Sequence, residues 1–207
     1  MKADSPTVDK SFFAPRVRGT PGRPRDPRID ASILRAAAEL LVEIGYSNVT
    51  MAAVADRAKT TKTALYRRWS SKAELVHEAV FPATPTALVT PSSSFADDVR
   101  AMVEATRDVF TTPVVRAALP GLVADVASDP VLNARVMQRF TGLFATVRDR
   151  VSRAVDEGDA RAEVDPDRLV EVVGGATMLR LLLRPGEDLD DQWVAQTTAI
   201  VVDGVVA

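Results

Sequence analysis

Short polar and basic side chains are concentrated just after residue 60, where they could form hydrogen bonds with nucleic-acid bases and phosphates. Leu65 and Trp69 lie four residues apart and would pack inward on a helix, which turns the polar positions outward. A helix that recognises base edges presents such groups while its other face packs on a neighbouring helix. The residues that would face a DNA groove are Lys62, Thr63, Tyr66 and Arg67.

The residues around this segment include candidates for contacts with the DNA backbone. Hydroxyl and cationic groups suit phosphate oxygens, and the exposed amides of helix N-termini add to such contacts. The candidates are Thr50, Thr61, Arg68 and Lys72. Taken singly, the threonines could equally be plain helix caps and the bases a solvated helix face, so the interpretation depends on the pattern as a whole.

The distribution of charge favours the DNA-binding interpretation. The net charge of the whole chain is only −2, but residues 1–78 contain 14 Lys and Arg against 9 Asp and Glu, which is +5. The remaining residues therefore carry −7. A basic N-terminal part joined to an acidic body is the asymmetry expected of a DNA-binding head on a larger domain.

The segments that have to position these side chains form a closely spaced pair of short helices. Thr50 and Thr61 are hydroxyl caps that open predicted helices over residues 51–58 and 62–69, with only residues 59–61 between them. This arrangement predicts a helix-turn-helix. A longer helix is predicted to begin at Asp30 and to stop at Gly45, and a capping box of Ser71 and a glutamate three residues later opens a fourth helix that reaches about residue 81.

Prolines and serines between residues 82 and 94 mark a domain boundary. The predicted organisation is a flexible basic arm over residues 1–27, a helix-turn-helix domain over residues 28–81 and a second domain over residues 94–207. In the second domain every segment has helical apolar spacing, which predicts helices over about 94–110, 113–127, 130–158, 166–183 and 191–205. The predicted fold class is all-α.

Several classes of protein are disfavoured by what the sequence lacks. Without cysteine there are no disulfides, thiolate metal sites or cysteine nucleophiles. The one histidine, His77, has no triad or zinc-site spacing around it, and there is no phosphate-binding glycine loop, so we predict no enzyme, no cofactor and no metal. His77 is interpreted as structural, at the junction of the two domains. Without a signal peptide or an apolar span of about 20 residues, a cytoplasmic protein with no membrane partner is expected.

The head resembles the tetracycline-repressor (TetR) family over about residues 29–78. The matching segments are Ile33–Leu41, Gly45–Tyr46, Val49–Met51, Val54–Ala55, Ala58, Thr61–Lys62, Leu65–Trp69 and Ser71–Leu75. The resemblance implies an all-helical homodimer whose three N-terminal helices bind operator DNA. We predict a palindromic operator in double-stranded DNA and repression by occlusion of a promoter, which is the simpler mechanism and the family default, although the sequence itself does not distinguish a repressor from an activator. The resemblance further implies that a ligand bound in the regulatory and dimerisation domain changes the spacing of the two heads and releases the DNA.

The resemblance also assigns roles to the candidate residues. It places Thr50, Tyr66 and Lys72 on the DNA backbone, and Lys62, Thr63 and Arg67 at the bases. The sequence departs from the family pattern at Lys59, where the turn commonly has glycine, and at Thr63, where a glycine or small residue is common. A residue other than glycine in a left-handed turn conformation would carry some strain.

The Pro- and Arg-rich segment over residues 21–25 resembles half of an AT-hook. Arg23 and Arg25 in such a segment would enter the narrow minor groove of A·T-rich DNA. The alternative is a solvated basic tail that strengthens DNA binding only through counterion release. The same arm raises a second possibility, an architectural DNA-binding protein with weak sequence preference and no response to small molecules. The large apolar body argues against that possibility.

A ligand pocket among the middle helices would have an apolar lining, which suits a small hydrophobic or amphipathic effector. The candidate lining residues are Met102, Phe110, Leu119, Leu122, Met137, Phe140, Phe144 and Met178. Apolar residues at helical spacing are also what an ordinary core requires, so the core remains the alternative.

The last two predicted helices, over about residues 166–183 and 191–205, are too apolar for a surface hairpin. We predict that they form the homodimer interface, and Gly174 and Gly175 would permit close helix approach. The same apolar face could instead pack inside one chain, under the long helix over residues 130–158.

Overall fold

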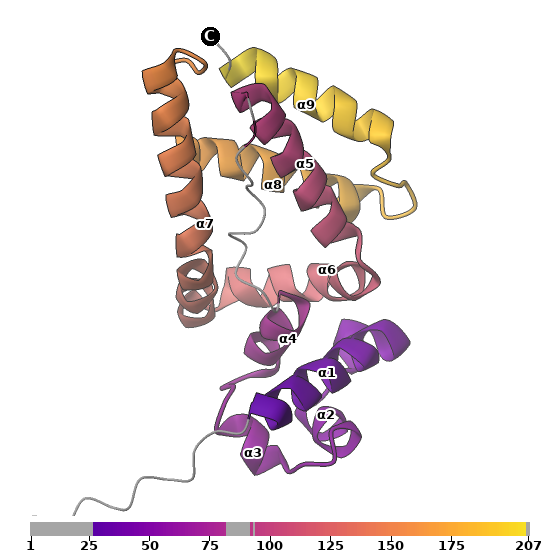
Figure 1. Ribbon diagram of the computed structural model, residues 1–207. Coiled ribbons are helices and arrows are strands. Elements are labelled where there is room, and N and C mark those ends of the chain that lie inside the picture. Colours follow the sequence, from indigo (N-terminus) through magenta and orange to yellow (C-terminus); the bar gives the residue numbers. More distant parts are fainter. Residues whose placement is uncertain (1–26, 82–91, 93, 206–207) are drawn as a thin grey trace, which may run out of the picture.

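The computed structural model describes residues 27–81, 92 and 94–205. Within these residues it contains nine α-helices and no β-strand, so the prediction of an all-α fold is confirmed. Helices α1 to α4 form the lower part of the molecule in Figure 1, the DNA-binding head of the sequence prediction. Helices α5 and α7 to α9 form the upper part, and α6 lies between the two. Residues 1–26 of the predicted arm and the linker over residues 82–91 lie outside the described residues. Residue 27, which was predicted as the end of the arm, belongs to α1, which begins three residues before the predicted start at Asp30.

The head contains α1 (Pro27–Asn48), α2 (Met51–Arg57), α3 (Lys62–Tyr66) and α4 (Lys72–Val80). Three of these helices begin where a side-chain oxygen accepts a hydrogen bond from a free amide. Thr50 accepts from the amide of residue 53 at 3.1 Å, Thr61 from that of residue 64 at 3.2 Å, and Ser71 from that of residue 74 at 3.1 Å. The predicted caps therefore set the starts of α2, α3 and α4.

Two backbone positions in the head have a positive φ. Gly45 has a φ of 73°, and it interrupts α1 where the sequence predicted that the helix would stop, although a further short turn reaches Asn48. Lys59 has a φ of 53°, and it is the turn residue where glycine is common in the family that the head resembles. Its side chain makes this left-handed conformation less favourable than it would be for glycine.

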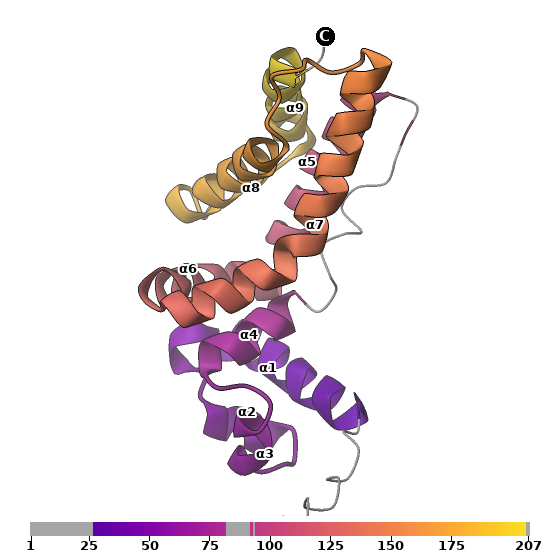
Figure 2. The ribbon, with the colours of Figure 1, turned by 90° about the vertical axis from the view of Figure 1, so that its left-hand side faces the viewer.

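The body contains α5 (Phe95–Thr111), α6 (Pro113–Ser128), α7 (Pro130–Glu157), α8 (Pro166–Leu183) and α9 (Asp191–Val205). Figure 2 shows α7 rising from the level of α6 to the far end of the body. Side chains of Ser94, Asp129 and Asp165 cap α5, α7 and α8. All five body helices begin within a few residues of the positions predicted from the sequence.

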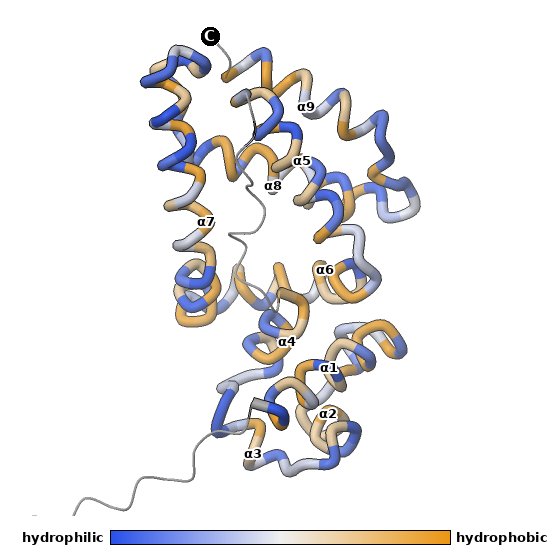
Figure 3. The backbone as a smooth tube through the Cα atoms, in the orientation of Figure 1, coloured by the Kyte–Doolittle hydropathy of each residue, from blue (hydrophilic) through white to orange (hydrophobic). Residues whose placement is uncertain are grey.

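Two apolar clusters hold these helices together. The first joins the head to the base of the body, because Ile33, Leu41 and Leu65 belong to the same cluster as Val115 of α6 and Val136 of α7. The second lies higher in the body, between α5, α7, α8 and α9. Figure 3 shows the apolar positions that recur along α7 with charged residues between them, which is the pattern of a helix packed on one side.

Helix α6 has an unusual pair of residues in its interior, Pro120 followed by Gly121. Proline has no amide proton, so the carbonyl of Arg116 lacks its helical hydrogen bond.

In the described part of the chain, no single helix has the length and hydropathy of a membrane span, and only α5 and α6 taken together, bent by 85°, pass that test.

Candidate nucleic-acid interface and internal cavity

Helix α3 ends at Tyr66, three residues before the predicted end at residue 69, and a turn continues from it. Together they have one buried face and one exposed polar face. Leu65 is fully buried and Trp69 is 3% exposed, so both pack inward as the spacing predicted. On the other side Tyr66 is 56% exposed, and the remaining predicted groove-facing residues, Lys62, Thr63 and Arg67, are exposed as well. The structure therefore brings these four side chains to one solvent-facing surface at the end of the molecule remote from the body, as Figure 1 shows for α3.

The two capping threonines lie exposed beside this surface. Each hydroxyl oxygen accepts a hydrogen bond from its own helix, which leaves the hydroxyl proton to donate to a second group. A phosphate oxygen is a suitable acceptor at such a place, because the amides of the first helical turn add positive potential.

Two predicted DNA contacts already have partners within the chain. Arg68 forms an ion pair with Asp30 of α1 and donates to the carbonyl of residue 64 at 2.9 Å. The Lys72 ammonium lies 3.2 Å from the carbonyl oxygen of Tyr46 and 4.1 Å from the centre of its ring. These contacts hold both cations close to the head. Arg23 and Arg25 lie outside the described residues.

The segment that follows α3 is tied to α4 and α7. Trp69 donates from its indole nitrogen to Glu78 at 2.9 Å, and the amide of Ser70 donates to Glu74 at 2.6 Å. Arg135 of α7 approaches Glu74 at 2.9 Å and donates to the Ser70 hydroxyl at 2.7 Å. No pattern in the sequence indicates this link, because its partners are more than sixty residues apart.

A second arginine of α7 repeats the contact one helical turn later. Arg139 lies 3.6 Å from Glu78 and donates to the carbonyl of Phe81 at 2.9 Å. We call the pairs Glu74–Arg135 and Glu78–Arg139 the α4–α7 ion pairs. Although burial alone would raise the pKa of Glu74, its hydrogen bonds with Ser70 and the charge of Arg135 lower the pKa of Glu74 below its usual value. Glu74 is therefore ionised at neutral pH.

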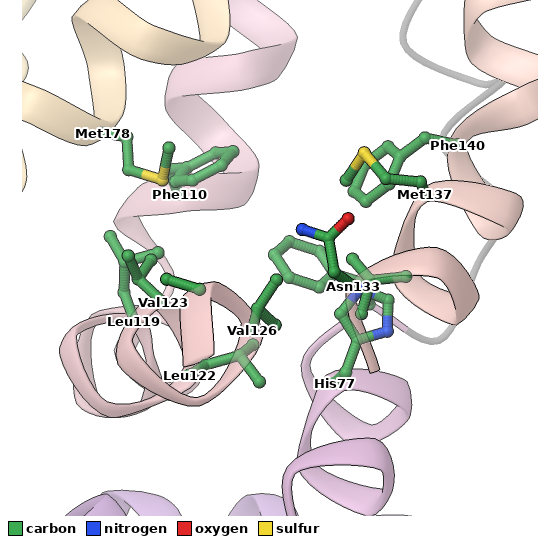
Figure 4. Close-up of a pocket in the computed structure, with 13 residues that line it drawn as sticks. His77, Phe110, Leu119, Leu122, Val123, Val126, Asn133, Met137, Phe140 and Met178 are labelled. Carbon is green, nitrogen blue, oxygen red and sulfur yellow. The ribbon is translucent and has the colours of Figure 1, made fainter. Parts of the chain in front are cut away.

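A partly open cavity of about 310 Å³ lies between α4 of the head and the helices of the body. Figure 4 shows its walls, which come from α4, α5, α6, α7 and α8. The lining residues are His77, Phe81, Phe110, Leu119, Leu122, Val123, Val126, Ala127, Asn133, Val136, Met137, Phe140 and Met178. They include six of the eight predicted pocket residues. Met102 instead lies beside the buried Asp98 and Arg150 in the upper body, and Phe144 is not part of this lining.

His77 is the residue of α4 whose side chain lines the cavity. The side chain is 4% exposed, and its Nε2 atom has no hydrogen-bond partner among the described residues. The rings of Phe81 and Phe140 lie 5.3 and 6.1 Å from the imidazole, measured between ring centres. Burial, and then the charge of Arg139, lower the pKa of His77 to about 4, so the imidazole is neutral at pH 7. The sequence placed His77 at the junction, but it did not indicate the unpaired nitrogen.

Tyr46 joins the end of α1 to α6. Its hydroxyl donates to Asp125, and its ring lies against Gly121. Burial and the neighbouring carboxylate raise the pKa of Tyr46 above its usual range, so the hydroxyl keeps its proton. The head is thus attached to the same helix that provides one wall of the cavity.

The comparison with known families matches both parts of this architecture. Residues 33–79 match the model described as bacterial regulatory proteins, tetR family. Residues 89–201 match the model described as tetracyclin repressor-like, C-terminal domain, which is more than half of the chain. The chain belongs to the TetR family. TetR-family proteins are DNA-binding transcriptional regulators and not enzymes.

Individual relatives extend the TetR-family match over almost the whole chain. The HTH-type transcriptional regulator Rv1556 of Mycobacterium tuberculosis is 30% identical over 91% of this chain and 91% of its own length. The HTH-type transcriptional regulator YdeS of Bacillus subtilis is 28% identical over 90% of this chain and 94% of its own. The crystal structure of the TetR family transcription regulator SCO0332 is 30% identical, with a TM-score of 0.66, over 86% of this chain and 98% of that one.

Helices α8 and α9 of this TetR-family regulator expose an apolar surface. Val172 is 53%, Leu179 58%, Leu183 71% and Ile200 75% exposed. A groove of about 250 Å³ runs between the two helices and includes Val172 and Ile200 in its lining. We call these four residues the α8–α9 face.

Among the described residues, no three His, Asp or Glu side chains are grouped as metal ligands.

Proposed function

We propose that this TetR-family regulator is a repressor that binds a palindromic operator as a homodimer and is released by a small hydrophobic effector. The observation that carries the proposal is the common wall of the head and the cavity. Helices α4 and α6 line the cavity on one side and contact α1 on the other. An occupant of the cavity therefore acts on the helices that hold the DNA-binding head.

Direct contacts with bases would come from Lys62 and Thr63 on the exposed face of α3 and from Arg67 directly after it. Tyr66, Thr50 and Thr61 would contact phosphates and fix the position of α3 in the major groove. Arg68 and Lys72 are restrained by Asp30 and Tyr46, and each would have to extend from its partner to add a phosphate contact. Arg23 and Arg25 would follow the minor groove next to α1.

Dimerisation would use the α8–α9 face. Large apolar side chains exposed together on two adjacent helices are typical of a surface that another protein covers. Gly174 and Gly175 have nothing within 4 Å of an added Cβ, so they leave room for the helix of a second copy. A two-fold axis there would present two α3 helices to the two half-sites of a palindrome. A regulator that acts on such an operator would work in the cytoplasm, where the bacterial DNA lies.

Repression would follow from occlusion of a promoter by the bound dimer. The cavity holds the effector in this proposal, and the predicted pocket residues Met102 and Phe144 lie outside its lining. Closure around an effector would shift α4 and α6, change the distance between the two α3 helices and lower the affinity for both half-sites at once.

The first test is selection of bound fragments from the source genome with the full-length protein. A palindromic motif with half-sites about one helical turn apart is the expected result. The salt dependence of binding to the selected site, measured by fluorescence anisotropy, separates phosphate contacts from base contacts. Binding without enrichment of any motif would instead indicate an architectural protein, and no binding at moderate salt would reject the DNA-binding proposal.

A further inference from the structure

We propose that the effector is a compact, neutral and mostly apolar molecule with one hydroxyl group, which forms a hydrogen bond with Nε2 of His77. This inference rests on the proposed function, because it takes the cavity to be the effector site. It goes further by naming the chemical class of the ligand and the atom that selects it.

The volume of the cavity limits the size of the ligand. The volume of the cavity is about 310 Å³, which favours a compact ligand. This is the lower end of the range of small-molecule sites. The wall includes Phe81, Phe110 and Phe140, which favour a flat aromatic or alicyclic skeleton that can stack on their rings.

The lining also restricts the charge of the ligand. Only His77 and Asn133 have polar side chains among the lining residues, and none of the lining residues carries an ionised acid or base. Arg135 and Arg139 line a neighbouring cleft that shares His77 with the cavity, and they are paired with glutamates there. A charged ligand would lose its hydration without gaining a counter-charge, so the cavity favours a neutral one.

His77 provides the feature that selects one polar group. Its side chain is more than nine-tenths buried, and its Nε2 atom lacks a partner among the residues that the structure describes. Figure 4 shows the imidazole rising from α4 next to the amide of Asn133. Its neighbours Phe81 and Phe140 are apolar and offer Nε2 no hydrogen bond, so an occupant of the cavity that reaches this nitrogen would supply one.

A hydroxyl group suits this nitrogen in either tautomer. In neutral histidine one ring nitrogen donates and the other accepts, and a hydroxyl can both donate and accept. A carboxylate could only accept, and an alkyl group would leave the nitrogen unpaired. Asn133 is exposed at the mouth of the cavity, where its amide can bind water or a second polar atom of a larger ligand.

The experiment uses the full-length protein and three probes of similar size: naphthalene, 1-naphthol and 1-naphthoate. Their dissociation constants are measured by calorimetry for the wild type and for His77→Leu. In the wild type, 1-naphthol should bind about five- to tenfold more tightly than naphthalene, since a buried hydrogen bond is gained, and 1-naphthoate should bind most weakly. In His77→Leu the preference for 1-naphthol should fall to within about twofold, while naphthalene still binds.

Two further variants keep the test informative. His77→Gln retains a hydrogen-bonding group and should keep part of the preference, which also covers the case in which His77→Leu does not fold. Met178→Leu changes an apolar part of the wall and should leave the preference intact. Thermal unfolding of each variant, followed by circular dichroism, shows whether it is folded.

Three results would overturn the inference. They are equal affinity for naphthalene and 1-naphthol, a preference that persists in His77→Leu, and no binding of any probe to the folded wild type. Release of the selected operator by 1-naphthol is measured separately. If His77 selects the hydroxyl but the operator stays bound, the ligand chemistry is right and the role of the cavity in regulation is wrong.

Discussion

The ring of Tyr46 occupies the space that a side chain on Gly121 would need. A Cβ atom added to Gly121 would lie 2.1 Å from Cδ1 of the tyrosine, far inside van der Waals contact. The same ring has the Lys72 ammonium over one face, and its hydroxyl donates to Asp125. One aromatic residue thus connects a candidate DNA-contacting lysine with a helix of the cavity wall.

Gly121→Ala is expected to destabilise the protein by roughly 1–3 kcal/mol, because the buried Tyr46 ring has to move. The free energy of unfolding from urea titrations measures the effect. The matched control is the same substitution in a Tyr46→Ala background. There it should be neutral or stabilising, since alanine is favoured over glycine in a helix by about 1 kcal/mol. An equal loss in both backgrounds would mean that the contact between the two residues is not the cause.

The α4–α7 ion pairs predict a second effect, on DNA affinity. Arg135→Ala removes the contacts with Glu74 and the Ser70 hydroxyl, which hold the segment after α3. We expect a change in stability of no more than about 1 kcal/mol, since the arginine side chain is 48% exposed, but a two- to fivefold weaker affinity for the selected operator.

The matched control for Arg135 is Arg148→Ala on the same helix. Arg148 pairs with Asp167 of α8 at 2.7 Å, far from the head, and its removal changes the net charge by the same amount. Operator binding by this variant, measured by anisotropy, should equal that of the wild type. If both variants lose affinity equally, the effect is one of overall charge and not of the link to α3.

His77 should make stability depend on pH. Its folded-state pKa of about 4 lies below the usual value of 6.5, so the unfolded chain binds a proton more readily. The stabilising contribution is full above pH 6.5 and is lost as the pH falls towards 4, by roughly 2–3 kcal/mol in all.

The comparison variant for this effect is His77→Gln, which retains a polar amide but does not titrate. Unfolding free energies at pH 4.5 and 7 should differ less for it than for the wild type. Glu74, Glu78, Arg135 and Arg139 face the same cleft as His77 and remain in both proteins, so their titration cancels in the comparison. If the unfolding free energies of the two proteins change equally between pH 4.5 and 7, groups other than His77 cause the pH dependence of the wild type.

Ile200→Glu is expected to convert the proposed homodimer into a monomer at micromolar concentration. In a dimer through the α8–α9 face, the new carboxylate would be buried among apolar side chains without a counter-charge. Sedimentation velocity measures the change. Val131→Glu introduces the same charge at a residue of α7 that is 64% exposed, and it should leave the dimer intact. If Ile200→Glu has the same oligomeric state as the wild type, α9 is not part of the dimer interface.

Substitutions in α3 should separate base recognition from backbone contacts. Lys62→Ala and Arg67→Ala are expected to change which operator variants are preferred, at about 1–3 kcal/mol for each contacted base pair. Tyr66→Phe should weaken binding to all variants alike. A panel of single-base operator substitutions, titrated with each protein, measures both effects. Uniform losses for all three proteins would contradict this division of roles.

Helix starts were predictable from the sequence because they depend on neighbours. Thr50, Ser94, Asp129 and Asp165 each bond to amides two or three residues ahead, and a pattern of that length can be recognised without a structure. The contact between Tyr46 and Asp125 spans 79 positions, and no local pattern marks either residue as the partner of the other.

The residues of α5 that line the cavity also could not be told apart from the sequence pattern alone. Met102 and Phe110 both fit the apolar pattern of α5, but they lie about 80° apart around the helix axis. Phe110 faces the cavity and Met102 packs in the upper body. Which side of α5 meets the space above the head depends on how α8 and α9 pack, and that packing has no trace in the sequence of α5.

The sequence Pro120–Gly121 gives α6 an uneven resistance to bending. One backbone hydrogen bond is missing at Arg116, and the next residue has no side chain to stiffen the turn. On one side of this point Val115 is held in the core that head and body share, and on the other Val126 lines the cavity. The helix is therefore most compliant between its anchored half and its half over the cavity. If the cavity is the effector site, as proposed, a small occupant would tilt one half against the other at this point, and Asp125 would carry that change of angle to Tyr46 and the head.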